Sequence, residues 1–148
     1  MTDERKHLER GIVVLIATLV VVGFAGIVAA EGLGKYRDVD RAEADGYVED
    51  PFGCVPNMGL HYGDFSRIDG DVTVGHPEML VYAHDDGDLR FLGVEYIATE
   101  EFSLFGHHAH PIPGTDWYGL HVWFFELNDD GRYADLHADV DADCTFEG

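Results

Sequence analysis

The sequence predicts a small, mainly β domain, an antiparallel sheet or sandwich and α+β at most, preceded by one N-terminal transmembrane helix. Three observations lead to this fold class. Residues Ile12–Ala30 form an uncharged, apolar run. The chain beyond it carries short runs of apolar, β-branched and aromatic residues, separated by turns rich in Asp and Gly. A pair of cysteines, Cys54 and Cys144, stands toward the two ends of that region.

The apolar run Ile12–Ala30 is long enough to cross a bilayer. At about 1.5 Å of rise per residue, a helix of this length spans roughly the hydrocarbon core. A basic segment precedes it, which predicts a cytoplasmic N-terminus. Two fates stay open: residues 1–30 remain as a signal anchor, or signal peptidase cuts after the small residues near Ala30. The length of the run favours the anchor.

The chain beyond the anchor divides into a linker and one domain. Residues 31–50 are polar and acidic and predict a juxtamembrane spacer, in which Asp38 caps a short helix over Val39–Ala44. Residues 51–148 form the predicted disulfide-closed ectodomain. Its first part, Pro51–Gly63, is rich in Gly and Pro and predicts a loop.

Three strands are predicted in the ectodomain. Met79–Ala83 and Leu89–Ala98 flank the Asp/Gly-rich segment 84–88, a pattern typical of a β-hairpin. Trp117–Leu127 is the most apolar and aromatic stretch of this domain. Both faces of that strand are apolar, so we expect it to be central and covered on both sides. A turn follows, after which 132–136 is expected to pair back.

Alternation along these strands places two ionisable residues among apolar neighbours. His121 shares a face with Trp123, and Glu95 is expected to share a face with Phe91 and Ile97. Buried polar groups need hydrogen-bonding or ionic partners. We therefore expect His121 and Glu95 to be partners of each other.

The chain is strongly acidic, with a formal net charge of −20 and 29 Asp and Glu against 9 Lys and Arg. Like charges oppose compaction in dilute buffer, but at molar salt the Debye length falls to about 3 Å. Because the carboxylates are spread along the chain, the composition favours adaptation to concentrated salt over an acidic docking patch. In this respect it resembles haloarchaeal proteins. No basic stripe is present to meet phosphates, which argues against nucleic acid as a partner.

The two cysteines, Cys54 and Cys144, predict a disulfide bond, because an exported chain meets an oxidising compartment. Closing so long a loop would stabilise the fold by about 4–5 kcal/mol in the chain-entropy model. Metal ligation and two free thiols are the alternatives, and neither suits that compartment.

Nine histidines make metal binding worth testing. His61, Glu95 and His121 lie on or beside the predicted core, and imidazoles with one carboxylate suit Zn²⁺ or Cu²⁺. The opposing interpretation is a buried histidine that hydrogen-bonds Glu95 or a backbone carbonyl.

A second set of candidate metal ligands lies in the loop Gly106–Asp116, which is dense in His, Pro and Gly. His107, His108 and His110 cluster there, but their spacing is more typical of a solvated surface run.

Calcium is a further possibility. Asp139, Asp141 and Asp143 alternate and would face one way on an extended segment, and Asn128–Gly131 offers hard oxygen ligands. Neither segment matches an EF-hand loop, and in so acidic a chain the composition favours a solvated acidic face for both.

Nucleophilic catalysis has little support in the sequence. The two serines, Ser66 and Ser103, stand outside any Gly-x-Ser-x-Gly motif, and no Gly-rich phosphate loop is present. An acid–base pair such as His121 and Glu95 is chemically conceivable, but nothing names a substrate. We therefore lean toward a non-enzymatic role.

Several short motifs occur in a fixed order over roughly residues 45–144. They are Met58-Gly59-Leu60-His61-Tyr62, Pro77-Glu78, Leu80-Val81-Tyr82, Gly93-Val94-Glu95-Tyr96, Leu104-Phe105-Gly106, Leu120-His121-Val122-Trp123, Asn128, Gly131, Ala134-Asp135 and Cys144. In this layout the chain resembles an uncharacterised family of small exported prokaryotic domains. The resemblance implies one domain and the disulfide, and it supplies no reaction. Leu136 departs from the family pattern, which has Trp after Ala-Asp.

Two functional hypotheses follow from the sequence. The first is a non-enzymatic accessory subunit of a halophilic prokaryote, single-pass in the cell membrane through residues 12–30. Its domain would lie outside the cell and bind another envelope or membrane protein. The alternative is a His/Glu metal-binding module for Zn or Cu, or a small metalloenzyme. If the signal is cleaved near Ala30, the same domain would be secreted.

Overall fold

The computed structural model describes residues 30–141 and Cys144. Within that part of the chain, no helix is long and apolar enough to cross a membrane. Apart from Ala30, the predicted anchor at residues 12–30 lies outside the described residues. The transmembrane segment therefore stays a prediction.

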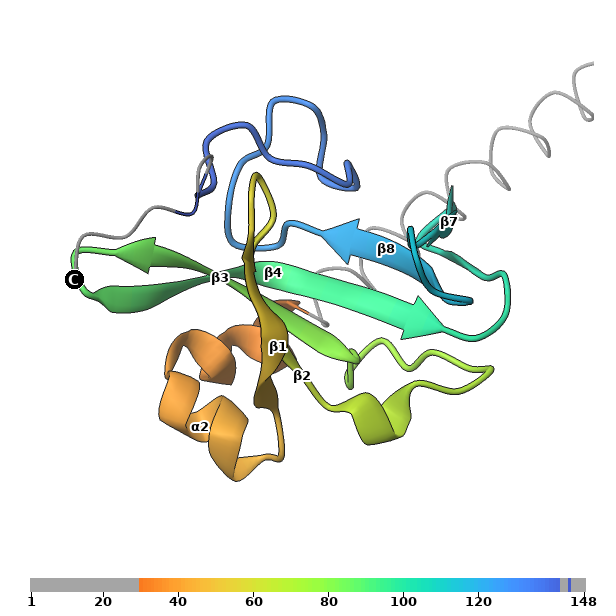
Figure 1. Cartoon of the computed structure of the whole chain (residues 1–148), viewed down its shortest axis with the longest axis horizontal. Helices are drawn as coiled ribbons and strands as arrows, with labels where there is room; N and C mark the ends of the chain where they lie inside the picture. The colour runs from red at the N-terminus through yellow and green to blue at the C-terminus, as the bar shows by residue number, and fades with distance from the viewer. Residues whose placement is uncertain (1–29, 142–143, 145–148) are drawn as a thin grey trace, which may run out of the picture.

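Among the described residues, six strands form one antiparallel sheet in the order β1-β2-β3-β4-β8-β7 (Figure 1). A second, two-stranded sheet pairs β5 with β6. The mainly β class is confirmed, with a single sheet as its main element. The strands are β1 (Val48–Val55), β2 (Gly59–Gly63), β3 (Met79–Asp85), β4 (Asp88–Ala98), β5 (Ser103–Leu104), β6 (His107–His108), β7 (His110–Pro111) and β8 (Tyr118–Val122).

The predicted hairpin is confirmed as β3 and β4. Asp86 and Gly87 connect the strands with φ angles of 50° and 92°. Two consecutive residues with positive φ are typical of a type I′ turn, whose twist matches that of the flanking strands. Pairing continues to the turn, where Asp85 faces Asp88, so both strands extend beyond their predicted ends.

The segment Pro51–Gly63 is not the loop that we expected. It contains most of β1 and all of β2, and every residue of β2 is buried. Gly59 has a φ of 86°, and a Cβ at this position would overlap the carbonyl oxygen of Tyr82. The glycine content here reflects close approach of neighbouring strands, which composition does not distinguish from a loop.

The strand predicted to reach Leu127 is shorter than expected. β8 ends at Val122, and the backbone amide of Trp123 donates to the carbonyl of Arg132. Residues 132–136 are irregular rather than a returning strand, because this contact is not continued as a ladder. β8 lies between β4 and the two-residue β7, one strand from the edge of the sheet.

The predicted spacer at 31–50 is part of the folded unit. It carries the helical turn η1 (Gly34–Arg37) and the helix α2 (Val39–Ala44). The side chain of Asp38 accepts a hydrogen bond from the amide of Asp40, which confirms the predicted cap. Four buried apolar side chains from this stretch join the sheet's core, so the fold begins before the boundary expected at residue 51. They are Leu33, Tyr36, Ala42 and Tyr47.

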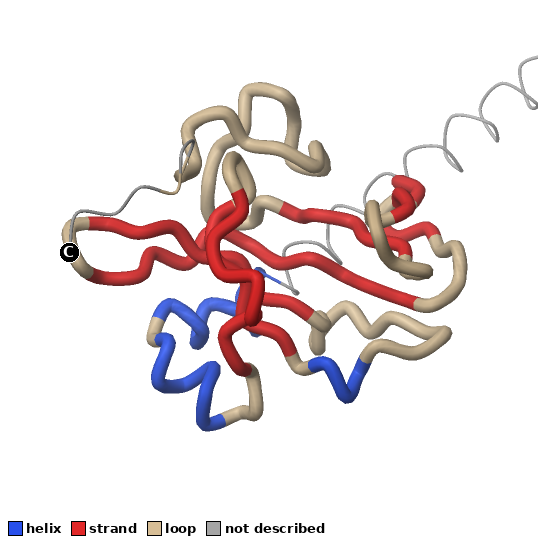
Figure 2. The backbone as a smooth tube through the Cα atoms, in the orientation of Figure 1, coloured by secondary structure: helices blue, strands red, loops and turns tan. Residues whose placement is uncertain are grey.

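The core has two parts, one on each face of the sheet. The larger part packs the helical segments against Leu80, Tyr82 and Val94, among others. The smaller part joins Val81, Leu92 and Trp123 with Val140 of the C-terminal loop; the remaining member is Ala83. Figure 2 shows this loop and the helices on opposite sides of the strands.

A bulge in β4 interrupts the alternation of side chains between the two faces that the sequence predicted for this strand. Val81 pairs with Gly93, whereas Tyr82 pairs with Phe91, so Leu92 is the extra residue. Phe91 consequently joins the core on the helical face. Glu95 shares the opposite face with Gly93 and Val81, so the expectation that Glu95 and Phe91 share a face is wrong.

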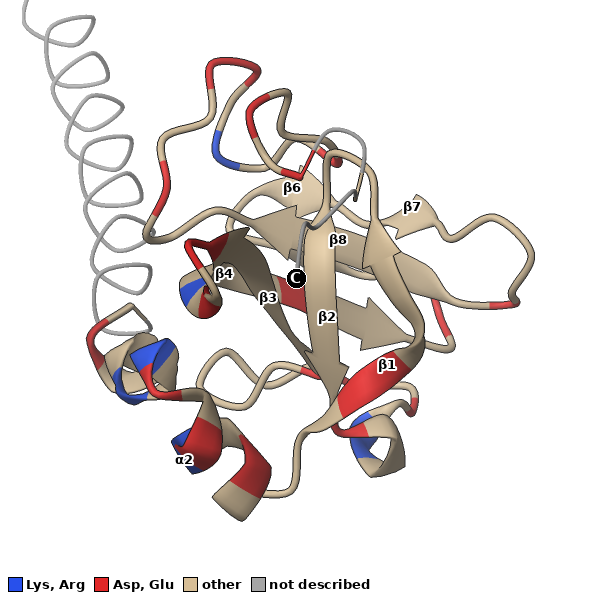
Figure 3. Cartoon of the chain, turned by 60° about the vertical axis from the view of Figure 1, so that its left-hand side comes forward, with Lys and Arg blue, Asp and Glu red and all other residues tan. Residues whose placement is uncertain are grey.

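The predicted disulfide is confirmed between Cys54 of β1 and Cys144, whose Cα atoms lie 5.8 Å apart. It joins the strand at one edge of the sheet to the end of the C-terminal loop. Figure 3 shows Asp and Glu distributed over many loops and elements rather than gathered in one patch. This distribution agrees with the spread seen in the sequence.

Candidate metal site

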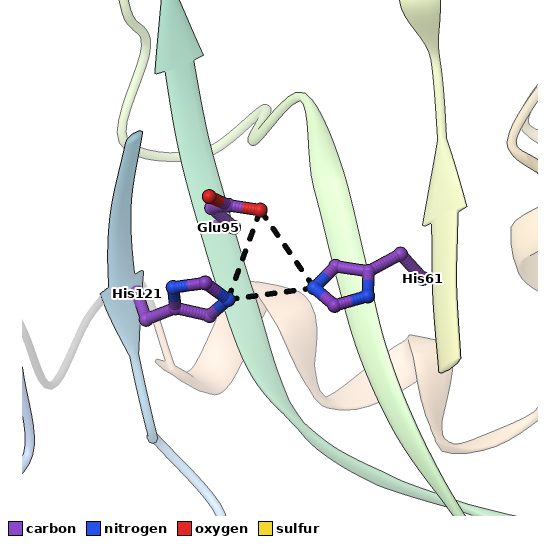
Figure 4. A group of neighbouring side chains, drawn as sticks. All are labelled: His61, Glu95 and His121. Carbon is purple, nitrogen blue, oxygen red and sulfur yellow. Dashed lines mark hydrogen bonds and ion pairs between the residues drawn. The ribbon is translucent and has the colours of Figure 1, made fainter. Parts of the chain in front are cut away.

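Three neighbouring side chains come from three different strands (Figure 4). His61 lies on β2, Glu95 on β4 and His121 on β8. Glu95 and His121 are direct partners across β4 and β8. His61 pairs with Val81 of β3, which in turn pairs with Gly93, so all of these residues share one face of the sheet. Register alone therefore brings the three side chains together.

The three ligand atoms form a nearly equilateral triangle. His61 Nε2 lies 3.4 Å from His121 Nε2, and each of these nitrogens lies 3.7 Å from Glu95 Oε2. A point between them lies about 2.1 Å from all three atoms, which matches Zn–N and Zn–O bond lengths. Within residues 30–141 and Cys144, the one group of three potential ligands with this proximity is His61, Glu95 and His121.

The site is almost completely withdrawn from solvent. His61, Glu95 and His121 are 6%, 8% and 4% exposed. The His121 ring stacks on Trp123 with an interplanar angle of 12°. The His61 ring packs edge-on against the His121 ring, with centroids 5.7 Å apart. Such contacts hold an imidazole in one orientation and leave its other nitrogen available to a ligand.

Burial controls the protonation of the cluster. Loss of hydration raises the pKa of Glu95 to about 7, although the neighbouring His61 acts in the opposite direction. The same cause lowers the pKa of His121 to about 4 and also lowers the pKa of His61. At neutral pH both imidazoles are therefore neutral, which is the form that coordinates a metal.

Two further carboxylates act on the site from outside it. Asp50 of β1 raises the pKa values of His61 and Glu95 electrostatically, and Asp135 does so for Glu95 and His121. Asp135 belongs to the C-terminal loop and pairs with His110 at 2.8 Å. The surroundings are therefore negative, which favours a cation at the centre of the cluster.

The loop histidines proposed as ligands do not converge in the structure. His107 stacks on Tyr133 with ring centroids 3.9 Å apart. Nδ1 of His108 lies 2.7 Å from the hydroxyl of Ser103, and His110 pairs with Asp135. All three loop histidines are exposed. Each of the three therefore contacts a different neighbouring side chain, as expected for histidines on a solvated surface loop.

The proposed calcium ligands also have other partners. Asp141 accepts a hydrogen bond from the amide of His84, and the Asn128 side chain caps its own turn by accepting from the amide of Asp130. Asp143 lies outside the described residues. Among the described residues, neither acidic segment forms a group of converging oxygens.

Sequence reasoning missed two buried polar residues, Glu78 and His137. Glu78 accepts a hydrogen bond from the amide of Ile97, and burial raises its pKa to about 7. His137 Nε2 lies 2.7 Å from the carbonyl oxygen of Leu127. Glu78 takes the place of a strand partner near the end of β4, and His137 ties together two parts of the irregular segment after β8, so we assign both residues structural roles. Glu78 stands in the Pro77-Glu78 motif noted above, but nothing in that motif indicates burial, and His137 stands in no motif at all.

No known protein family, curated protein or solved structure matches the chain. The resemblance to a family of small exported domains therefore stays a prediction.

Proposed function

We propose that this domain is a metal-binding module that holds one Zn²⁺ or Cu²⁺ ion. The ligands are Nε2 of His61, Nε2 of His121 and Oε2 of Glu95. The observation that carries the proposal is their mutual spacing of 3.4 to 3.7 Å, which places one point at bonding distance from all three atoms.

A hydrogen-bonded cluster without metal explains the arrangement less well. The two imidazoles lie at hydrogen-bonding distance, with their Nε2 atoms 3.4 Å apart, but at 3.7 Å the Glu95 carboxyl is too far from either nitrogen for a hydrogen bond. Burial keeps this carboxyl protonated below about pH 7, and ionising it is costly unless a cation compensates the charge. A divalent ion at the centre of the triangle supplies that charge and occupies both nitrogens.

The donor atoms narrow the choice of ion. Calcium and magnesium take oxygen ligands, whereas two imidazoles suit a first-row transition metal or zinc. Two histidines and one glutamate are also a known protein ligand set for zinc. The predicted anchor would place such a module at the outer face of the cell membrane, beside an envelope or membrane protein, and that placement stays a prediction.

Metal content tests the proposal directly. The full-length chain, purified in detergent at molar salt, is stripped with a chelator, reloaded with zinc and analysed by mass spectrometry. We expect about one equivalent of tightly bound metal, and His61→Ala or His121→Ala should weaken binding at least about 100-fold. Less than about 0.2 equivalents in the unaltered chain would reject the proposal.

His108→Ala is the matched control for the metal titration. This exposed residue belongs to the loop histidines that were the other candidate metal ligands. It lies on β6, in the separate two-stranded sheet, and not in the sheet that carries His61, Glu95 and His121. We expect unchanged zinc affinity in this variant. A loss equal to that of His61→Ala would assign the metal to the loop instead.

A further inference from the structure

We propose that Gly119 is a positioning residue that directs the Glu95 carboxylate to present a single oxygen, Oε2, to the metal. This inference rests on the proposed function and adds the reason why glycine stands at this point of β8.

Strand register places Gly119 beside the ligand carboxylate. Gly119 pairs with Ile97, and His121 pairs with Glu95, so Glu95 and Gly119 are diagonal neighbours on one face. A Cβ built on Gly119 would overlap Glu95 Oε1. That oxygen therefore occupies the space that a side chain at position 119 would fill.

Ile112 also borders this space. Its Cδ1 and Cγ1 atoms would lie 3.0 and 3.1 Å from a Cβ on Gly119. Glu95 Oε1 thus rests over Gly119 against an apolar wall, while Oε2 lies 3.7 Å from each histidine nitrogen. The two carboxylate oxygens have separate surroundings, which favours one-oxygen binding.

The backbone does not itself require glycine at position 119. Gly119 is not among the residues with positive φ, unlike Gly59 or Gly87. An alanine would therefore be accepted by the main chain, and its methyl group would displace the flexible end of Glu95. The missing side chain is explained by the space that the carboxylate takes.

The experiment compares the full-length chain with Gly119→Ala and with Gly75→Ala. Gly75 has open space around its Cβ position and no positive φ, so it controls for adding a methyl group. We expect zinc affinity to fall about 10-fold or more in Gly119→Ala, as for other residues that orient a ligand. The visible spectrum of the cobalt-loaded protein should change as well. Gly75→Ala should match the unaltered chain in both measurements.

A double-mutant cycle separates positioning from a general packing effect. In a Glu95→Gln background, Gly119→Ala should cause no further loss of zinc affinity, because it acts through the same carboxylate. Additive losses, or an unchanged cobalt spectrum in Gly119→Ala, would overturn the inference.

A second variant covers the case in which Gly119→Ala lowers stability too far. Ile112→Ala opens the wall beside the carboxylate, and combining it with Gly119→Ala should restore part of the lost affinity. No recovery in a folded double variant contradicts the inference. Failure of the unaltered chain to bind zinc rejects the proposed function itself, whereas normal binding by Gly119→Ala rejects this inference alone.

Discussion

At the scale of single residues, the chemistry of the domain centres on Glu95. It is an acid buried between two imidazoles and influenced from outside by Asp50 and Asp135. Burial raises the pKa of Glu95 to about 7 and lowers that of His121 to about 4. Between these values the metal-free site holds a protonated Glu95 and a neutral His121. Metal binding must then displace the carboxyl proton.

Zinc affinity should therefore rise with pH. Below about pH 7 each bound ion releases roughly one proton from Glu95, so affinity should increase up to tenfold per pH unit and level off above pH 7. Competition titrations from pH 5.5 to 8 measure this slope. Glu95→Gln should bind weakly with a flat profile over that range. An equally steep profile in Glu95→Gln would show that another group releases the proton.

At the scale of secondary-structure elements, β2 positions His61, one of the two candidate histidine ligands. The strand is fully buried and lies between β1 and β3. Gly59 begins it with a φ of 86° directly against the carbonyl oxygen of Tyr82. His61 follows two residues later on the same buried strand. The conformation at Gly59 thus supports the pairing of β2, the strand that carries this candidate ligand.

Gly59→Ala should disturb this element. The new Cβ has no space beside the Tyr82 carbonyl, and positive φ is unfavourable for alanine, so we expect a loss of roughly 2–4 kcal/mol in the free energy of unfolding. Denaturant unfolding at constant salt measures the change. Gly87→Ala is the control, since it also has positive φ but open space around it; its cost should be about 1 kcal/mol. Equal losses in the two variants would exclude the steric contribution.

At the scale of the whole molecule, the disulfide and the C-terminal loop cover one face of the sheet. Cys54 and Cys144 are 90 residues apart in sequence. The loop between β8 and Cys144 contributes Val140 to the core on the same face as the metal site. The acidic side chains, in contrast, are distributed over the exterior (Figure 3). We therefore expect the stability of the folded domain to depend on the disulfide bond and on screening of the repulsion between surface carboxylates by salt.

Removing the disulfide should destabilise the domain substantially. Replacing both cysteines by serine is expected to cost about 2–5 kcal/mol, because the bond closes a long loop in the unfolded chain. Urea unfolding of the metal-free protein at molar salt provides the measurement, with the reduced unaltered chain as a second sample. Saturating zinc should recover part of the loss by binding the folded state alone. A double-serine variant as stable as the oxidised chain would contradict this prediction.

The sequence by itself determined the features that depend on local pattern. These are the β3–β4 hairpin through its Asp86-Gly87 turn, the cap at Asp38, the cysteine pair, and the partnership of Glu95 with His121. The hairpin and the cap follow from residue preferences over a few positions. The disulfide follows from two cysteines in an exported chain, and the Glu95–His121 partnership from the need of buried polar groups for partners.

Only the tertiary structure decided which elements lie side by side. It placed β2 and its His61 two strands from β4, although the composition of that segment predicted a loop. It also shifted Phe91 to the opposite face from Glu95 through the bulge at Leu92. Pairing between distant strands depends on packing throughout the sheet, and a one-residue bulge reverses side-chain direction, so neither is encoded in a local pattern.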